Sequence, residues 1–291
     1  MTTSTTALPP SVQHALKLVP ALHDMTLEEL WNSARSNHPN PLCAFGGKTF
    51  SQTDEDGITL EILRRLDLLN GGTYAELGVG NGLENNTLIL AALGWRGFWA
   101  GSENLAFTYQ DSSAFCFFQD WIDVDNIIDL CKRGLSRINS KQLDVISLDL
   151  DGNDYHFIEL ILDSGLTPRL FICEYNGLFL PPIEYVMPYQ SSYRWSGGME
   201  FGASITSLEK LFARHGYRLV CCNAASGANA FFIRTEEQTR FSDVPTCVRD
   251  LFVPLRSRLL QTRHPQRLKQ LVEHIFSGLS GNAETGPMPT P

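Results

Sequence analysis

One stretch combines a carboxylate with three closely spaced glycines. Residues 74–82 read Tyr-Ala-Glu-Leu-Gly-Val-Gly-Asn-Gly, so that Glu76 precedes Gly78, Gly80 and Gly82. Glycines in a turn between a strand and a helix let a ligand approach the backbone and the free amides of the helix. The spacing E-x-G-x-G-x-G differs from the dinucleotide fingerprint G-x-G-x-x-G. It predicts either a nucleoside-cofactor loop that includes Asn81 or a structural glycine-rich turn.

Polar residues follow the next two predicted strands and complete a possible nucleoside pocket. Glu103 comes 21 residues after Gly82 and can accept hydrogen bonds from both ribose hydroxyls. Asp120 can accept a hydrogen bond from an exocyclic adenine amine, and Trp121 offers a flat face for the base. Each residue alone is typical of a solvated acid or a packed ring. Together, at successive strand ends, they predict an adenosyl cofactor.

Carboxylates are concentrated after the fourth and fifth predicted strands. Asp149, Asp151 and Asp154 lie within six residues, and Glu174 ends the next strand. Close carboxylates repel one another unless a cation or proton lies among them, and hard oxygen donors suit Mg²⁺, Mn²⁺ or Ca²⁺. One interpretation is a divalent metal held by Asp149, Asp151 and Glu174. The other places Asp149 at the sulfonium and amino end of the cofactor while the remaining acids cap helices and bind loop amides.

Candidate bases and substrate contacts surround these acids. Asp151 and His156 are the candidate general bases, although a surface or packing role explains His156 equally well. The long segment 176–203 is predicted to be either a lid over the cleft or a loop anchored by its aromatic residues. The predicted substrate contacts are Gln52, Tyr155, Glu174, Asn176 and Trp195.

Alternating strand-like and helix-like segments are predicted to position these residues. Five strands are expected to be parallel because helices separate most of them, and the last two strands form an antiparallel hairpin. The predicted strands span 73–77, 97–101, 114–118, 144–148, 169–174, 217–223 and 230–234. The predicted helices span 58–69, 83–93, 126–130, 155–164 and 204–215.

Composition limits the classes of protein that this chain can belong to. Its 291 residues suffice for one large α/β domain with additions, and its net charge of −9 argues against a broad nucleic-acid footprint. The seven cysteines show no C-x-x-C spacing, which indicates buried reduced thiols. Neither a signal peptide nor a membrane-length apolar run is visible. We therefore expect a soluble cytoplasmic protein with a small-molecule substrate and no nucleic-acid or membrane partner.

The domain boundaries follow from changes in composition. Residues 1–11 and 279–291 are predicted to be disordered tails, and 12–50 to form an N-terminal helical cap. The cofactor domain is predicted to span 51–240. Further helices are expected over 241–278, where they either close the domain or pair two subunits as a homodimer.

Several longer motifs carry a family resemblance. They are Ser51–Gly57, Glu76–Thr87, Asp149–Tyr155, Glu174–Asn176 and Asn229–Phe232. Over about residues 50–235 the chain resembles the FkbM-like branch of class I S-adenosylmethionine-dependent methyltransferases. The resemblance implies an α/β Rossmann-like fold with a seven-stranded, mostly parallel sheet that ends in an antiparallel hairpin. It also implies S-adenosylmethionine bound by the glycine loop, Glu103 and Asp120.

The strand-four acids are also similar to those of the metal-dependent catechol methyltransferases, but two positions differ. Glu174-Tyr175-Asn176 replaces an adjacent Asp-Asn pair, and Gly152 stands where those enzymes have a catalytic lysine. Three hypotheses follow. The first is methyl transfer to an O or N atom of a small metabolite in a biosynthetic pathway. The others are a metal-assisted cyclisation or elimination of the same cofactor, and a non-catalytic partner subunit.

Overall fold

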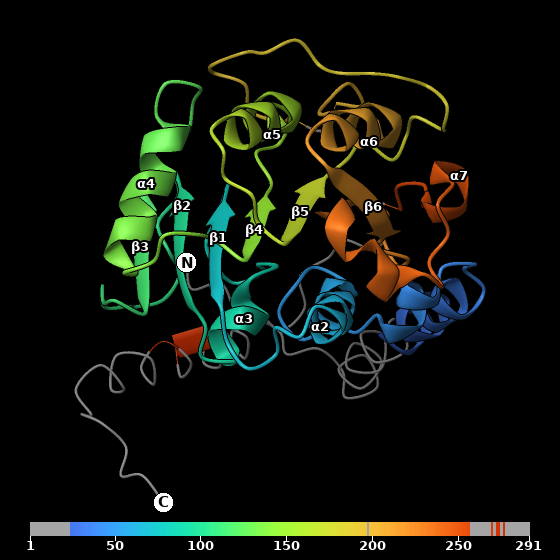
Figure 1. The fold of residues 1–291 in the computed structure, drawn as a ribbon, viewed down its shortest axis with the longest axis horizontal. Helices are drawn as coiled ribbons and strands as arrows, with labels where there is room; N and C mark the ends of the chain where they lie inside the picture. The colour runs from blue at the N-terminus through green and yellow to red at the C-terminus, as the bar shows by residue number, and fades with distance from the viewer. Residues whose placement is uncertain (1–23, 197, 257–268, 270–271, 274–275, 277–291) are drawn as a thin grey trace, which may run out of the picture.

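The computed structural model describes residues 24–196, 198–256, 269, 272, 273 and 276. A seven-stranded sheet in the order β3-β2-β1-β4-β5-β7-β6 forms its centre (Figure 1). β1 to β5 are parallel, and β7 runs antiparallel to both β5 and β6. The predicted mostly parallel α/β sheet with a C-terminal antiparallel hairpin is therefore confirmed. The strands are β1 Thr73–Leu77, β2 Arg96–Gly101, β3 Phe115–Gln119, β4 Val145–Leu148, β5 Leu170–Glu174, β6 Tyr217–Cys222 and β7 Asn229–Arg234.

Helices cover both faces of the sheet. α2 (Glu55–Arg65) and α3 (Leu88–Ala92) lie on one face, whereas α4 (Ile127–Arg137), α5 (Asp154–Asp163) and α6 (Ile205–Arg214) lie on the other (Figure 1). The central strands are therefore apolar on both faces, and every residue of β1 and β4 is buried. α6 begins where the Ser204 side chain accepts a hydrogen bond from the Ser207 amide at 3.2 Å.

Two of the helices that differ from the sequence prediction do so for identifiable reasons. The helix predicted over 83–93 begins only at Leu88, because Glu76 binds the amides of Asn86 and Thr87 and holds the preceding residues in turns. The helix predicted over 126–130 continues to Arg137. Gly134 permits this extension, since a β-carbon there would overlap the ring of Phe98.

The segments outside the cofactor domain are described in part. Residues 24–36 are helical, as predicted, and the 3-10 helix η1 spans Pro41–Phe45. Residues 12–23 of the predicted helical cap and both predicted tails lie outside the described residues. The C-terminal segment contains the 3-10 helix η2 (Thr235–Phe241) and the short helix α7 (Val248–Leu251). Phe276 packs against Phe107 and Phe115, so this segment contacts the domain, and homodimer pairing stays a prediction.

The described residues contain neither a membrane-spanning helix nor a disulfide. No helix in the described ranges is both long and apolar enough to span a bilayer. All seven cysteines are free thiols, and only Cys247 is exposed.

Gly78 is a position where the fold requires glycine for two reasons. Its φ angle is +97°, and a β-carbon would overlap the carbonyl oxygen of Asp149. Gly94 has a comparable φ of +78° but open space around it. We expect Gly94→Ala to lower the free energy of unfolding in urea by about 1 kcal/mol, the cost of the left-handed conformation. Gly78→Ala should cost several-fold more or prevent folding, and equal costs would contradict the described packing.

Candidate functional site

A cleft lies at the carboxyl ends of the central parallel strands. It has two adjoining compartments, with about 650 Å³ and about 790 Å³ of empty space open to solvent. The compartments share Gly78, Gly80, Asp149 and Asp151. These residues follow β1 and β4, which are neighbours where the strand order changes direction. Open α/β sheets bind ligands at this point, so the cleft is the candidate functional site.

Close backbone contacts fix the floor of the cleft. The amides of Gly78 and Val79 both donate to the Ala100 carbonyl oxygen, at 2.9 and 3.0 Å. The Asp149 amide donates to the Leu77 carbonyl oxygen at 3.0 Å. The loops that follow β1, β2 and β4 are therefore held together at one edge of the sheet. This agrees with the sequence prediction, which placed the residues after these strands in one pocket.

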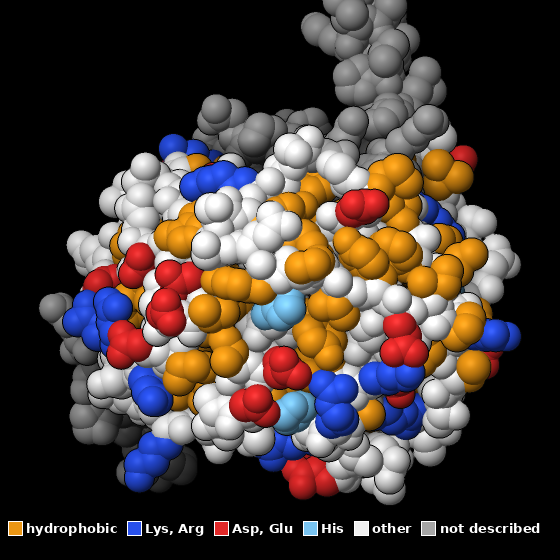
Figure 2. All heavy atoms as spheres, turned by 90° about the horizontal axis from the view of Figure 1, so that it is seen from above, with side chains coloured by type: hydrophobic (Ala, Val, Ile, Leu, Met, Phe, Trp, Pro, Cys, Tyr) orange, Lys and Arg blue, Asp and Glu red, His pale blue; other side chains and the backbone are white. Residues whose placement is uncertain are grey.

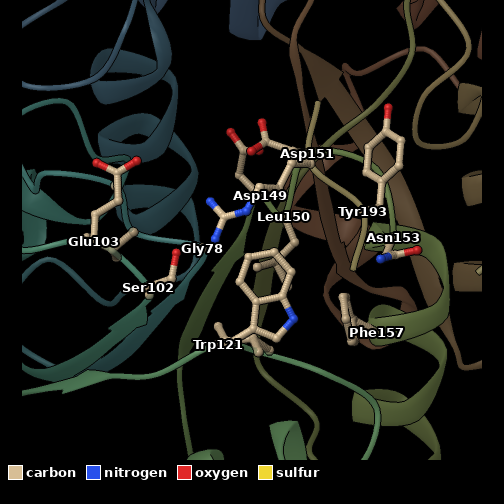
Figure 3. Close-up of a pocket in the computed structure, with 15 residues that line it drawn as sticks. Gly78, Ser102, Glu103, Trp121, Asp149, Leu150, Asp151, Asn153, Phe157 and Tyr193 are labelled. Atoms are coloured by element: carbon tan, nitrogen blue, oxygen red, sulfur yellow. The ribbon is translucent and has the colours of Figure 1, made fainter. Parts of the chain in front are cut away.

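The first compartment combines one carboxylate with flat apolar walls. Glu103 is exposed, and its Oε2 atom lies 3.8 Å from the position that a β-carbon of Gly80 would occupy. Trp121, Leu150 and Phe157 supply the apolar surface, and Figure 3 shows the indole of Trp121 standing in this space. An aromatic face beside a carboxylate at the end of β2 suits a nucleoside. Asp120, by contrast, is exposed and is not among the residues that line the cleft.

The second compartment is lined mainly by acids and amides. Asn229 forms part of its wall and donates from Nδ2 to Oε1 of Glu55, at 3.1 Å. Gln52, a predicted substrate contact, also lies here. The other polar lining side chains are Glu76, Asn81, Glu84, Asn85, Asn86, Asp149 and Asp151. This composition favours a ligand with positive charge and hydrogen-bond donors.

Glu76 has a structural task within this compartment. Its carboxylate oxygens accept hydrogen bonds from the amides of Asn86 (2.9 Å) and Thr87 (3.0 Å) and from the Thr87 hydroxyl (2.5 Å). Burial raises the pKa of Glu76 to about 7, although these hydrogen bonds oppose the shift. The free amides before α3 are thus already bound to an anion of the protein itself.

Asp149 titrates abnormally at the junction of the compartments. The side chain is half-buried, and burial together with the charges of Asp154 and Asp151 raises its pKa to about 8. The pKa of Glu174 lies well above its usual range for the same reasons, with Asp149 its strongest charged neighbour. Asp154 orders the loop, because its two oxygens accept from the amides of Leu150 (2.8 Å) and Gly152 (2.9 Å).

The metal prediction receives no geometric support. Among the described residues, no group of three or more His, Cys, Asp or Glu side chains is arranged to hold a metal ion. Asp149 and Asp151 line the cleft, whereas Glu174 is not among its lining residues. A site formed by Asp149, Asp151 and Glu174 therefore stays a prediction from the sequence.

Two further predicted residues lie outside the cleft. The Nε2 atom of His156 is 2.8 Å from the Met187 carbonyl oxygen, and its ring packs edge-on against Tyr189. Tyr155 lies on the outer side of α5, where its hydroxyl oxygen accepts from Arg214 at 3.3 Å. Packing explains both positions, and neither residue lines either compartment.

Asn176 and Trp195 also serve the loop instead of the cleft. Asn176 is fully buried and donates to the carbonyl oxygens of Met199 and Phe201, each at 2.9 Å. Trp195 is exposed, donates to the Gly198 carbonyl oxygen and packs near Phe201. Both contacts hold the long loop in place, which favours the anchor interpretation for these two residues.

The loop nevertheless contributes to the cleft through residues that sequence analysis did not assign. Asn153 donates from Nδ2 to the Gln190 carbonyl oxygen at 2.8 Å and accepts from the Gln190 amide at 3.1 Å. This double contact holds Tyr193 and Arg194 over the first compartment, where the Arg194 guanidinium lies 4.5 Å from the Trp121 ring centre. The sequence does show Asn153 within the run Asp-Gly-Asn-Asp at residues 151–154, but only the acids of that run were assigned roles from the sequence.

Apolar side chains are exposed along the same loop. Figure 2 looks down on the face formed by α5, α6 and the loop and shows hydrophobic side chains gathered there. The loop's large exposed hydrophobic residues are Leu178, Leu180, Ile183, Trp195 and Met199.

Comparisons with known proteins give limited information. No protein-family profile matches the chain. No curated protein matches its sequence. Among solved structures it is similar to cofactor-bound Rv0187 from MTB, with 11% identity, 79% of this chain and 99% of that chain covered, and a TM-score of 0.37. A likeness this weak carries no argument about function.

The acids of the cleft predict an unusual dependence of stability on pH. Folding raises the pKa of Glu76 to about 7, of Asp149 to about 8 and of Asp154 to about 6, so the folded state binds these protons more tightly. Their stabilising contribution is complete below the unfolded pKa near 4 and is lost as the pH rises through 6 to 8. We expect the urea midpoint to fall between pH 5 and pH 8.

Asp149→Asn should flatten that slope and raise the free energy of unfolding at pH 8 by on the order of 1 kcal/mol. The exposed Asp125→Asn is the matched control and should leave the slope unchanged. An Asp149→Asn protein with the wild-type slope would show that this carboxyl is not the titrating group.

The two hydrogen bonds between the Asn153 side chain and the Gln190 backbone, here called the Asn153 clamp, should hold the loop in place. Asn153→Ala deletes two hydrogen bonds to the Gln190 backbone, each worth on the order of 1 kcal/mol. We expect amide hydrogen exchange across residues 187–195 to accelerate by about tenfold or more, while the central strands keep their protection. Asn104→Ala, at an exposed position, is the control. Unchanged exchange in Asn153→Ala would mean that other contacts hold the loop.

Proposed function

We propose that this protein is an S-adenosylmethionine-dependent methyltransferase that acts on an O or N atom of a small molecule. The observation that carries the proposal is the concentration of carboxyl groups in the cleft. Glu76, Glu84, Glu103, Asp149 and Asp151 line its two compartments, and Glu76 already binds the amides that precede α3. S-adenosylmethionine brings a sulfonium and an ammonium group, which suit these acids.

The main rival for a glycine-rich loop of this kind is a dinucleotide. Its pyrophosphate needs free amides at a helix N-terminus. Here the carboxylate of Glu76 occupies the amides of Asn86 and Thr87, and further acids surround the space. A pyrophosphate would therefore meet repulsion at the point where the dinucleotide fold supplies attraction.

The residues present fit the parts of S-adenosylmethionine. Glu103 would accept from the ribose hydroxyls, and Trp121, Leu150 and Phe157 would enclose the adenine. The methionine portion would lie in the second compartment, among its acids and amides. The strand order β3-β2-β1-β4-β5-β7-β6 with an antiparallel β7 adds support, since the family resemblance implies such a sheet.

When bound, the cofactor supplies an electrophilic methyl group, and the protein mainly positions the acceptor for in-line attack. Asp151 is the proposed general base, because it is exposed at the boundary of both compartments. Its backbone φ of +58° is unusual for a residue with a side chain, and such conformations are found more often at functional sites than elsewhere. Tyr193 and Arg194, held by the Asn153 clamp, would shield the bound nucleoside from water.

The reaction product distinguishes methyl transfer from the two alternative functions. Methyl transfer adds one CH₂ unit to an acceptor and releases S-adenosylhomocysteine, whereas a metal-assisted cyclisation or elimination leaves no methylated acceptor. No arrangement among the described residues favours the metal-assisted route. A partner subunit without catalysis would bind the cofactor without turnover or fail to bind it.

The proposal predicts a strong effect at Glu103. Glu103→Ala removes charge-assisted hydrogen bonds to the ribose and should weaken S-adenosylmethionine binding by about 10- to 100-fold in equilibrium dialysis. Asp125→Ala removes an exposed acid outside the cleft and should bind like the wild type. Equal affinity in wild type and Glu103→Ala would refute the assigned nucleoside compartment. Release of S-adenosylhomocysteine with a pool of small metabolites then tests turnover.

A further inference from the structure

Two buried cysteines from distant parts of the chain meet behind the cleft. Cys43 belongs to η1 and Cys221 to β6, and their Sγ atoms are 3.8 Å apart. Both side chains are fully buried. A disulfide has an S–S distance near 2 Å, so the two sulfur atoms must come about 1.8 Å closer for a bond to form.

The contact is built by residues that hold η1 against β6. Asn40 caps η1 by accepting from the Leu42 amide at 3.1 Å, and its Nδ2 atom donates to the Val220 carbonyl oxygen at 2.7 Å. Val220 lies where the pairing of β6 with β7 is irregular, between Leu219 and Cys221. Irregularities of this kind redirect the side chains that follow them. One asparagine thus positions Cys43 opposite the redirected Cys221.

His38 polarises one of the two thiols. Its Nδ1 atom lies 3.1 Å from the Asn40 amide nitrogen and 3.3 Å from the Cys43 sulfur, so the amide and the thiol share this ring nitrogen as a hydrogen-bond acceptor. Hydrogen bonding from Cys221 and His38 lowers the pKa of Cys43 to about 6, against the effect of burial. The thiolate is the form of cysteine that attacks oxidants. Cys222 is a poorer partner, because its thiol interacts with Tyr175.

We propose that Cys43 and Cys221 form a peroxide-responsive dithiol pair that closes to a disulfide. The Cys43 thiolate attacks hydrogen peroxide, the O–O bond breaks, and the sulfenic acid forms as hydroxide leaves and takes up a proton to become water. The Cys221 sulfur then displaces hydroxide from the sulfenic sulfur, and a second water carries away its thiol proton. Two thiols are oxidised by two electrons, and one peroxide is reduced to two waters.

The position of the pair connects it to the cleft. The chain continues from Cys43 to Gln52, and from Cys221 through Asn223 to Asn229, and both Gln52 and Asn229 line the second compartment. Asn223 bridges the two segments by donating from Nδ2 to the Thr53 hydroxyl at 2.9 Å. A Cys43–Cys221 disulfide would therefore tie together the segments that carry two walls of that compartment.

Mass spectrometry of the full-length protein tests the proposal. The reduced protein is treated with a modest molar excess of hydrogen peroxide, remaining thiols are alkylated, and the digest is sequenced. We expect the loss of two hydrogen atoms and a peptide cross-link between Cys43 and Cys221, both reversed by dithiothreitol. Cys43→Ser and Cys221→Ser should abolish the link, whereas Cys222→Ser and the remote Cys131→Ser should retain it. The oxidised protein should melt on the order of 5–10 °C higher than the reduced protein.

Three outcomes would overturn the proposal. They are a Cys43 that stays a free thiol, one that is oxidised to sulfinic acid without a link, and one linked to Cys222 or to another molecule. Should either serine variant fail to fold, the cross-link in the wild type and in Cys222→Ser still decides the question. The proposal does not depend on the bound cofactor, so its failure leaves the methyltransferase proposal intact.

Discussion

The buried carboxylate of Glu76 is the constraint on which the site depends. Glu76 lies one residue before the end of β1 and accepts three hydrogen bonds from Asn86 and Thr87, which delays the start of α3 until Leu88. The residues between Gly78 and Thr87 consequently form an open loop instead of a helix. That loop creates the second compartment, and the same carboxylate removes the anion-binding capacity that a helix N-terminus would otherwise provide.

The other features of the cleft build on this arrangement. Gly78 lets the loop pass directly against the Asp149 backbone, so the acids after β4 face the acids after β1 and β2. Burial, and to a smaller extent repulsion from the other acids after β4, raise the pKa of Asp149 and of Glu174. A cation relieves such repulsion. The repulsion between carboxylates in the cleft therefore favours a positively charged ligand, and this preference is the basis for proposing S-adenosylmethionine as the cofactor.

The sequence predicted the residues at the strand ends of the site better than those that the long loop contributes. Strand ends could be located because apolar runs give way to glycine and acidic residues. Glu76, Glu103, Trp121, Asp149 and Asp151 were placed at one edge of the sheet in this way, and all five line the cleft. Local sequence does not determine which side chain of a long loop turns inward. Asn176 and Trp195 were predicted to contact the substrate, but neither lines the cleft, whereas the unassigned Tyr193 does.

Contacts between residues far apart in the sequence could not be predicted either. The clamp of Asn153 on Gln190 joins positions 37 residues apart, and the contact of Cys43 with Cys221 joins positions 178 apart. In neither pairing does the sequence indicate which distant residue is the partner. His156 illustrates the opposite error, because its place near the acids suggested a base, whereas the fold directs its ring toward the Met187 carbonyl oxygen.

The central claim is that the cleft selects a cationic nucleoside over a dinucleotide. Calorimetric titration of the wild-type protein with S-adenosylmethionine and, in parallel, with NAD tests it most directly. The account predicts micromolar affinity for S-adenosylmethionine, independent of Mg²⁺, and no measurable heat with NAD. Binding of NAD with comparable affinity, or binding of neither compound, would contradict it.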